Sequence, residues 1–504
     1  MYAVFTVVFA VYLFCTIGLL IYGLNCYVMI ALFARRRRQA RDSTVDAQRR
    51  FDDVVRRGNV PTVTTQIAIY NEMNVSERVM RAACRMRYPK GKHEIQVLDD
   101  STDETRGLVE RVADELRREG HEIKVLHREI RTGYKAGALA DGLTQARGEY
   151  VAVFDADFVP PENYLTTSIP FFLTDDKLGF VQARWGYLNR DSSLLTRAQA
   201  IGIDGHFIIE QIARCWNGLF MNFNGTAGVW RKSAIDLSGG WQGDTLTEDL
   251  DLSYRVQFAG WNALYVPDLV VPAELPEDVN ALRGQQFRWA KGSVQTLIKL
   301  FPALMRAPVS SFKKFEAILH MGGYLVHPMM LTLSILALPI LFLTADYKPS
   351  PWIFTIVSVP LILSIIAPST LYFISQRATY RDWLKRVLIL PMLVVVGVGL
   401  ALSNSRAIYE AVVGRKSEFV RTPKRGDKLI KRYDVKLPPV AILEILLGAY
   451  SAWSLSYYVL AGKLLVSPFL AIYAAGFLFI GLLTLLHAWG VPPGRFRARR
   501  AGAP

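Results

Sequence analysis

The sequence predicts an α/β domain with a mostly parallel sheet, inserted between transmembrane α-helices. Three observations lead to this prediction. Apolar stretches crowd the first 33 residues and the region after Leu319, whereas residues 35–310 have the mixed composition of a water-soluble domain. Within that domain short apolar runs alternate with helical patterns, which is typical of a parallel sheet with covered faces. Basic clusters lie beside the apolar segments, as they do on the cytoplasmic side of membrane proteins.

The chain of 504 residues carries a formal net charge of +15. Clustered Lys and Arg can neutralise the phosphates of nucleic acids. Here they flank apolar segments, so we expect a lipid bilayer as the partner and no nucleic acid. The four cysteines form no Cys-x-x-Cys or Cys/His cluster, so neither a disulfide framework nor a zinc site is expected.

The first apolar segment covers residues 2–33 and is followed by four consecutive arginines at 35–38. A secretory signal has the opposite order, with its basic residues ahead of a shorter apolar core. About 20 residues suffice to cross a bilayer. We therefore predict a transmembrane helix in residues 1–34, with the N-terminus outside and residues 35–310 in the cytoplasm.

Four later segments, at 319–344, 352–374, 438–461 and 466–488, are also long enough to span a bilayer. The run at 387–403 is shorter and has basic residues on both sides, so we prefer an interfacial or re-entrant segment there. This gives five spans in a multi-pass protein of the inner cell membrane, and six spans are the alternative. The membrane region is then 311–488, and residues 489–504 form a basic cytoplasmic tail.

The soluble domain is expected to begin with strands at 62–69, 94–98, 123–126 and 150–154, and with helices at 75–86, 106–119 and 135–146. In open α/β sheets, ligands collect beyond the carboxyl ends of the strands. Polar residues follow three of the predicted strands there, at 70–72, 99–100 and 155–157. This coincidence predicts a binding site at that edge of the sheet.

Asp155 and Asp157 end the strand at 150–154 and share one of its faces, because alternate strand residues point to the same side. Two like charges so placed repel unless a cation lies beside them. Mg²⁺ or Mn²⁺ prefers oxygen ligands and bridges to phosphates. The pattern predicts a metal site, and a solvated loop at a strand end is the alternative.

Residues 99–103 (Asp-Asp-Ser-Thr-Asp) could hold a nucleoside, or could form an acidic turn or a helix N-cap. Residues 133–139 open a helix, where Lys135 and the nearby Arg131 suit a diphosphate, although small residues here also fit close helix packing.

Residues 247–249 (Thr-Glu-Asp) precede a predicted helix at 250–258. They could cap that helix, or supply a general base facing an acceptor hydroxyl.

Residues 285–289 (Gln-Gln-Phe-Arg-Trp) lie on a helix leading toward the membrane. Arg288 can bind phosphate and Trp289 can stack on a sugar, although both residue types also anchor interfacial helices.

Taken in order, these motifs resemble those of the processive family 2 glycosyltransferases, the cellulose synthase superfamily, and most closely its cellulose-synthase-like A and C groups. The resemblance covers residues 60–300 closely and is carried by the segments 66–72, 96–103, 133–139, 154–158, 181–185 and 223–231. It implies a GT-A fold and inverting transfer from a nucleotide sugar to a growing β-1,4-linked polysaccharide (mannan, glucomannan or glucan) that is exported across the membrane.

The resemblance also implies roles for individual residues. The catalytic residues would be Asp249, as the base that activates the acceptor hydroxyl, with Glu248 and Asp155. Asp157 would bind the Mg²⁺ or Mn²⁺. The donor would be held by Tyr70, Glu72, Asp99, Asp100, Lys135, Asp155, Gln285 and Arg288, and the acceptor by Trp289, Phe223 and Gly225.

Residues 419–424 (Phe-Val-Arg-Thr-Pro-Lys) are similar to the gating-loop motif of cellulose synthase, Phe-x-Val-Thr-x-Lys, in which the loop folds over the bound donor. Arg421 replaces the valine, and Thr422 and Lys424 would contact the donor. The segment 387–436 would then combine the interfacial stretch with a cytoplasmic gating loop.

A membrane lipid glucosyltransferase of the ceramide type is a second candidate, because it shares Asp-x-Asp and Gln-x-x-Arg-Trp but adds a single sugar. A transporter with a vestigial domain is disfavoured, because the spans carry almost no charges and the acidic motifs are intact. The motifs do not separate GDP-mannose from UDP-glucose, and they leave a homo-oligomer or an export partner open.

Overall fold

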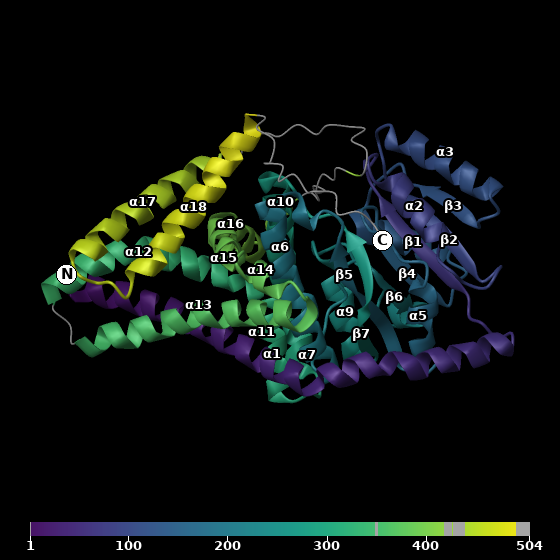
Figure 1. The fold of residues 1–504 in the computed structure, drawn as a ribbon, viewed down its shortest axis with the longest axis horizontal. Helices are drawn as coiled ribbons and strands as arrows, with labels where there is room; N and C mark the ends of the chain where they lie inside the picture. Colours follow the sequence, from purple (N-terminus) through teal and green to yellow (C-terminus); the bar gives the residue numbers. More distant parts are fainter. Residues whose placement is uncertain (1, 348–350, 418–425, 427–438, 490–504) are drawn as a thin grey trace.

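The computed structural model describes residues 2–347, 351–417, 426 and 439–489. One end of the molecule consists of long helices, and the other contains a sheet with helices on its faces (Figure 1). The two parts are joined by α1 (Tyr2–Arg56) and by α10 (Val279–Arg306) and α11 (Ser311–Met321), which lead out of the sheet domain.

A seven-stranded sheet forms the centre of the soluble domain, in the order β3-β2-β1-β4-β6-β5-β7. Its strands are β1 (Val63–Ile69), β2 (His93–Asp99), β3 (Ile123–His127), β4 (Tyr150–Asp155), β5 (Leu178–Tyr187), β6 (Gly228–Arg231) and β7 (Asn262–Ala273). All pairings are parallel except those of β6, which runs antiparallel to both neighbours. The mostly parallel sheet is confirmed, and the four predicted strands are present.

Strand β4 illustrates why the sequences of these strands are continuous apolar runs. Ala152 and Phe154 enter one hydrophobic core, whereas Val151 and Val153 enter the other. Successive strand residues point to opposite faces, and both faces here are covered by helices. The first polar side chain of β4, Asp155, comes where the strand leaves the core at its carboxyl end.

Short helices cover the sheet and connect its strands. They are α2 (Ser76–Cys84), α3 (Thr105–Arg118), α4 (Tyr134–Thr144), α5 (Tyr164–Phe172), α6 (Leu194–Asp204), α7 (Gln211–Trp216), α8 (Lys232–Leu237) and α9 (Glu248–Phe258), with the helical turns η1 (Arg190–Ser192) and η2 (Gly205–Glu210). The helices predicted at 75–86, 106–119, 135–146 and 250–258 correspond to α2, α3, α4 and α9.

Five helices are long and apolar enough to cross a membrane: part of α1, α12 (Val326–Tyr347) with the preceding turn η3 (Gly323–Leu325), and parts or all of α13 (Pro351–Thr379), α17 (Val440–Leu460) and α18 (Ser467–Ala488). They correspond to the five predicted spans. The predicted boundary at residue 34 is not a break in structure, because α1 is one helix of 55 residues. Neither Gly nor Pro occurs between 35 and 56 to end it.

The segment predicted to be interfacial or re-entrant is a bent helical region. It comprises α14 (Trp383–Val387), α15 (Leu390–Gly399) and α16 (Ala401–Val412). The helical pair Trp383–Gly399 and Ala401–Val412 is bent by 43° at the break between its two parts. Within the described residues, a sixth crossing exists only if this bent pair acts as one span.

Candidate active site

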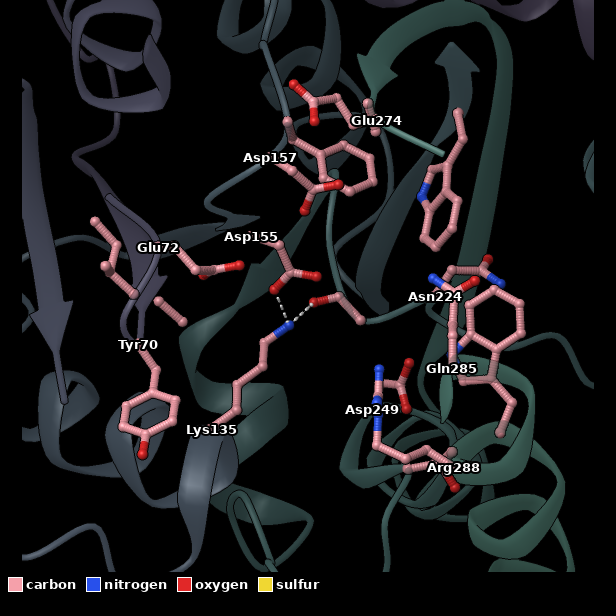
Figure 2. Close-up of a pocket in the computed structure, with 18 of the residues that line it drawn as sticks. Tyr70, Glu72, Lys135, Asp155, Asp157, Asn224, Asp249, Glu274, Gln285 and Arg288 are labelled. Atoms are coloured by element: carbon pink, nitrogen blue, oxygen red, sulfur yellow. Dashed lines mark hydrogen bonds and ion pairs between the residues drawn. The ribbon is translucent and has the colours of Figure 1, made fainter. Parts of the chain in front are cut away.

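A pocket lies at the carboxyl ends of β1, β2 and β4, between the sheet and helices α9 and α10 (Figure 2). This is the edge of the sheet where the polar strand ends predicted a site. The predicted site residues that line it are Tyr70, Glu72, Asp100, Lys135, Asp155, Asp157, Gly225, Glu248, Asp249, Gln285, Arg288 and Trp289. Residues separated by up to 219 positions in the chain thus meet in one cavity.

Lys135 occupies the centre of the pocket, from the first turn of α4. Its ammonium group donates to Asp155 Oδ1 and, over 2.6 Å, to the backbone carbonyl of Gly225 (Figure 2). Burial lowers the pKa of Lys135, but the carboxylates of Asp155, Glu248 and Asp249 outweigh it, and the pKa is raised. Lys135 therefore carries a positive charge into the pocket at neutral pH.

Asp155 and Asp157 extend from the end of β4 into the same cavity (Figure 2). The backbone N–H of Asp155 donates to Thr226 Oγ1 at 2.9 Å, which fixes the turn after the strand. Within the described part of the chain, no group of three or more His, Cys, Asp and Glu side chains could hold a metal by itself. The carboxylates fit a hard cation such as Mg²⁺ or Mn²⁺ only if further oxygen ligands come from a bound diphosphate or from water.

Glu248 and Asp249 form the first turn of α9. Thr247 does not cap this helix through its side chain. Its hydroxyl instead lies 3.2 Å from that of Thr296 on α10. Burial and the charge of Glu248 raise the pKa of Asp249 to about 7, although the N–H of Leu250 and the charge of Lys135 oppose this. Asp249 can therefore accept a proton near neutral pH, as a general base must.

Gly225 lies directly against the Asp249 carboxylate. Its φ of +79° belongs to the left-handed region that favours glycine, and a Cβ at this position would lie 3.0 Å from Asp249 Oδ2. The close approach places the Gly225 carbonyl within reach of Lys135. A glycine is thus required here both by the backbone conformation and by the space beside Asp249.

Helix α10 forms the opposite wall and supplies Gln285, Arg288 and Trp289. The Asp278 side chain caps its N-terminus by accepting from the N–H groups of Asn280 and Ala281. Burial lowers the pKa of Arg288 to about 10, although nearby acidic groups, Asp155 first, oppose the shift. The guanidinium is therefore still charged at neutral pH.

The side of the pocket nearest β2 contains an aromatic and basic cluster. The Arg131 guanidinium lies 3.5 Å from the centroid of the Tyr70 ring and 5.0 Å from that of Tyr134. Arg128 donates through two nitrogens to the carboxylate of Asp100, over 2.8 and 2.6 Å. This arrangement offers a flat cationic surface and a fixed carboxylate, which suit a base and a ribose.

Two residues predicted to contact donor or acceptor, Asp99 and Phe223, are not among those that line the pocket. Asp99 does not line the pocket: it is fully buried, and its carboxylate binds His127 Nδ1 at 2.9 Å and the N–H of Ser101 at 3.1 Å. Its neighbour Asp100 reaches the pocket because successive residues of an extended chain point to opposite sides. Phe223 is also fully buried and is packed edge-on against Phe180 and Trp230.

Thr422 and Lys424, predicted to contact the donor, lie outside the described residues. Among the lining residues that were not predicted are two with polar side chains, Asn224 and Glu274. Asn224 lies between Phe223 and Gly225 and is held by Gln211 Nε2 at 2.6 Å and by His206 Nε2 at 2.9 Å. Glu274 directly follows β7, so the rule of polar residues at strand ends would have identified it had that strand been predicted.

Comparisons with known proteins identify the family of the chain. Residues 61–292 match the family described as Glycosyltransferase like family 2. Glucomannan 4-beta-mannosyltransferase 7 of Arabidopsis thaliana is 35% identical over 440 residues, which cover 84% of this chain and 77% of that protein. Glucomannan 4-beta-mannosyltransferase 2 of the same plant is 35% identical over 387 residues, covering 74% and 70%.

Among solved structures, the mannosyltransferase PcManGT from Pyrobaculum calidifontis, in complex with GDP-Man and Mn2+, is 20% identical with a TM-score of 0.48, and the match covers 78% of this chain and 99% of that one. The extended similarity to the plant enzymes includes the sheet domain and much of the membrane region. The chain therefore belongs to glycosyltransferase family 2, as a homologue of the glucomannan 4-β-mannosyltransferases in the cellulose synthase superfamily.

Proposed function

We propose that this glycosyltransferase builds a β-1,4-linked mannan, or the mannose units of a glucomannan, by adding successive mannose units from GDP-mannose with inversion at C1. The named activity of the relatives supports the product class. The observation that carries the mechanism is the position of Asp249, a carboxylate with a pKa of about 7 in the same cavity as Lys135 and Arg288. A base and two cations in one pocket suit transfer from a sugar diphosphate to a hydroxyl.

In the proposed reaction, an acceptor hydroxyl lies against Asp249 and gives its proton to that carboxylate as its oxygen bonds to C1 of the donor sugar. The bond between C1 and the diphosphate oxygen breaks on the opposite face, and the diphosphate leaves with the electron pair. Lys135 and Arg288 stabilise the negative charge that develops on the leaving group. A divalent cation at Asp157 would supply further positive charge to the diphosphate.

We also assign the nucleoside of the donor and the acceptor sugar to different sides of the pocket. Tyr70, Arg131 and Asp100 offer the surface for the base and ribose, next to β2. Trp289, on the α10 wall and 6.4 Å from the ring centroid of Trp185, offers a flat face for the acceptor sugar. The acceptor then lies beside the helix that leads toward the membrane, where a growing chain could leave.

The catalytic domain is proposed to face the cytoplasm, with the N-terminus outside, because Arg35–Arg38 follow the first apolar segment. Lys90 is exposed on the sheet domain, so a K90C variant tests this orientation. A membrane-impermeant thiol reagent should label it in inverted vesicles but not in sealed vesicles of native orientation. The reverse labelling pattern would place the domain outside.

The activity test uses the full chain in lipid nanodiscs with GDP-mannose or UDP-glucose, each with Mg²⁺, Mn²⁺ or a chelator. We expect a polymer from GDP-mannose that an endo-β-1,4-mannanase degrades, and none from the D249N variant. A product limited to one sugar on a lipid would contradict the proposal. A polymer made only from UDP-glucose and degraded only by a β-1,4-glucanase would contradict the donor assignment.

A further inference from the structure

A second cavity, of about 560 Å³, lies away from the active site, where the sheet domain meets the membrane helices. Its walls come from three segments far apart in the chain: the end of the apolar part of α1, the turn after α7, and the start of α11, which lie together in Figure 1. The Asn217 side chain donates to the carbonyl of Leu32 at 3.2 Å and so joins α1 to the turn. Nothing in the transfer reaction uses this cavity.

Three basic side chains line the cavity, and its described lining residues include no Asp or Glu. Arg35, Arg36 and Lys313 provide three positive charges. None of them forms an ion pair within the described ranges, and Arg36 Nε is shielded from solvent with no hydrogen-bond partner there. Burial lowers the pKa of Lys313. Its ammonium group lies 4.1 Å from the centroid of the Phe220 ring. Three such charges concentrated in one hollow attract an anion.

The cavity lies at the depth where the lipid headgroups of a bilayer would be. Leu32 lies near the end of the apolar stretch of the first predicted span, and the arginines begin at Arg35. Phe312 and Phe315, on the first turns of α11, are each 48% exposed, as expected of side chains that enter the boundary of a bilayer. Ser310 caps α11 beside Lys313 and adds the positive end of a helix dipole.

We propose that this cavity binds the headgroup of an anionic phospholipid from the leaflet that faces the catalytic domain. The phosphate would lie between Arg36 and Lys313, and the acyl chains would extend along the exposed apolar surface of α1 toward its N-terminus. Basic pockets between helices at the cytoplasmic side have the charge and the location to hold such headgroups. The inference depends on the membrane position of α1, and not on which sugar the enzyme transfers.

The test is native mass spectrometry of the full chain in detergent, titrated with phosphatidylglycerol or with phosphatidylcholine of the same acyl chains. The unaltered protein should bind phosphatidylglycerol more tightly. The double variant R36Q/K313Q should weaken that binding by about ten- to thirtyfold, since each basic side chain near a lipid surface contributes about 1 kcal/mol. Binding of phosphatidylcholine should be unchanged.

The matched control is R37Q/R38Q, which removes two exposed arginines from the same helix without changing the lining of the cavity. It should retain the preference for phosphatidylglycerol, and the charge-conserving variant R36K/K313R should retain most of it. An equal loss in R36Q/K313Q and R37Q/R38Q would show a diffuse surface attraction and overturn the proposal.

A competition measurement and two single variants complete the test. Inorganic phosphate or glycerol phosphate that displaced phosphatidylglycerol at equal concentration would make a free phosphate anion the ligand, and would also overturn the proposal. Should R36Q/K313Q fail to elute as a folded species in gel filtration, the single variants R36Q and K313Q replace it. Each single variant is then expected to lose part of the lipid preference, and the absence of any loss in both would contradict the site.

Discussion

Arg283 of helix α10 and Glu444 of membrane helix α17 form an ion pair of 2.7 Å, and both side chains are almost completely buried. Arg283 also donates to Thr484 on α18 at 2.8 Å. Close by, Asp278 at the start of α10 contacts His487 of α18 at 2.9 Å. These contacts hold the N-terminal end of the helix that carries Arg288 and Trp289 against the membrane helices. The active site and the membrane region are therefore mechanically connected.

Breaking this ion pair from one side should destabilise the protein strongly. R283M leaves the Glu444 carboxyl buried without its partner, a change that typically costs about 3–5 kcal/mol, whereas R283M/E444L should recover much of that loss. Thermal unfolding of the full chain in detergent measures both. The control is R87Q in the exposed Arg87–Glu162 pair, for which a change of at most about 1 kcal/mol is expected. Equal effects of R283M and R87Q would refute the structural role of Arg283.

Replacing Asp249 should abolish transfer without preventing donor binding. D249N keeps the shape of the side chain but cannot accept the acceptor proton, so kcat should fall by about 10²–10⁴ while the affinity for the nucleotide sugar changes little. Initial rates and donor binding by calorimetry separate the two quantities. Full polymer synthesis by D249N would show that the base is another group.

The rate should increase with pH and level off above about 7, because Asp249 must be deprotonated to act as a base and its pKa is raised to about 7. The charge of Glu248 contributes to that raised pKa. E248Q removes the charge, so its pH profile should shift toward lower pH. A profile that fell with pH across this range, or an E248Q profile shifted upward, would contradict the assignment. Profiles of kcat/KM against pH provide the measurement.

Adding one methyl group at Gly225 should impair catalysis more than folding. The Cβ of G225A would lie 3.0 Å from Asp249 Oδ2, and the residue would be held at a φ of +79°. The control is G260A, which has a similar φ of +88° but meets no atom within 4 Å. Both variants should lose about 1 kcal/mol of stability from backbone strain, but only G225A should lose kcat. Equal rates in the two variants would indicate that the space beside Asp249 is not critical.

Removal of divalent metal should stop the reaction, and Mg²⁺ or Mn²⁺ should restore it. The described residues hold no metal site of three protein ligands, so the metal should bind weakly until the donor diphosphate is present. Binding of Mn²⁺, measured by electron paramagnetic resonance, should therefore tighten when GDP is added. D157N should reduce that tightening. Activity unchanged by a chelator would exclude a required metal.

The predictions from sequence were most reliable where a local pattern determines the structure. The strand ending at Asp155 was recognisable because every residue of β4 before it is buried, and a strand buried on both faces is a continuous apolar run. The spans followed from their length and hydropathy. The boundary expected at residue 34 marks the end of the first span, but α1 continues beyond it, because a charge cluster marks the edge of a membrane and does not end a helix.

The sequence by itself determined the first four strands, the apolar helices and the acidic residues at the strand ends, since alternation and hydropathy act over a few neighbouring residues. Only the tertiary structure decided that Asp100 faces the pocket while Asp99 faces His127, and that Phe223 belongs to the core. It also brought Asp249 against Gly225 and joined Arg283 to Glu444. These relationships depend on how distant segments pack, and no local pattern specifies which side of a segment borders a cavity.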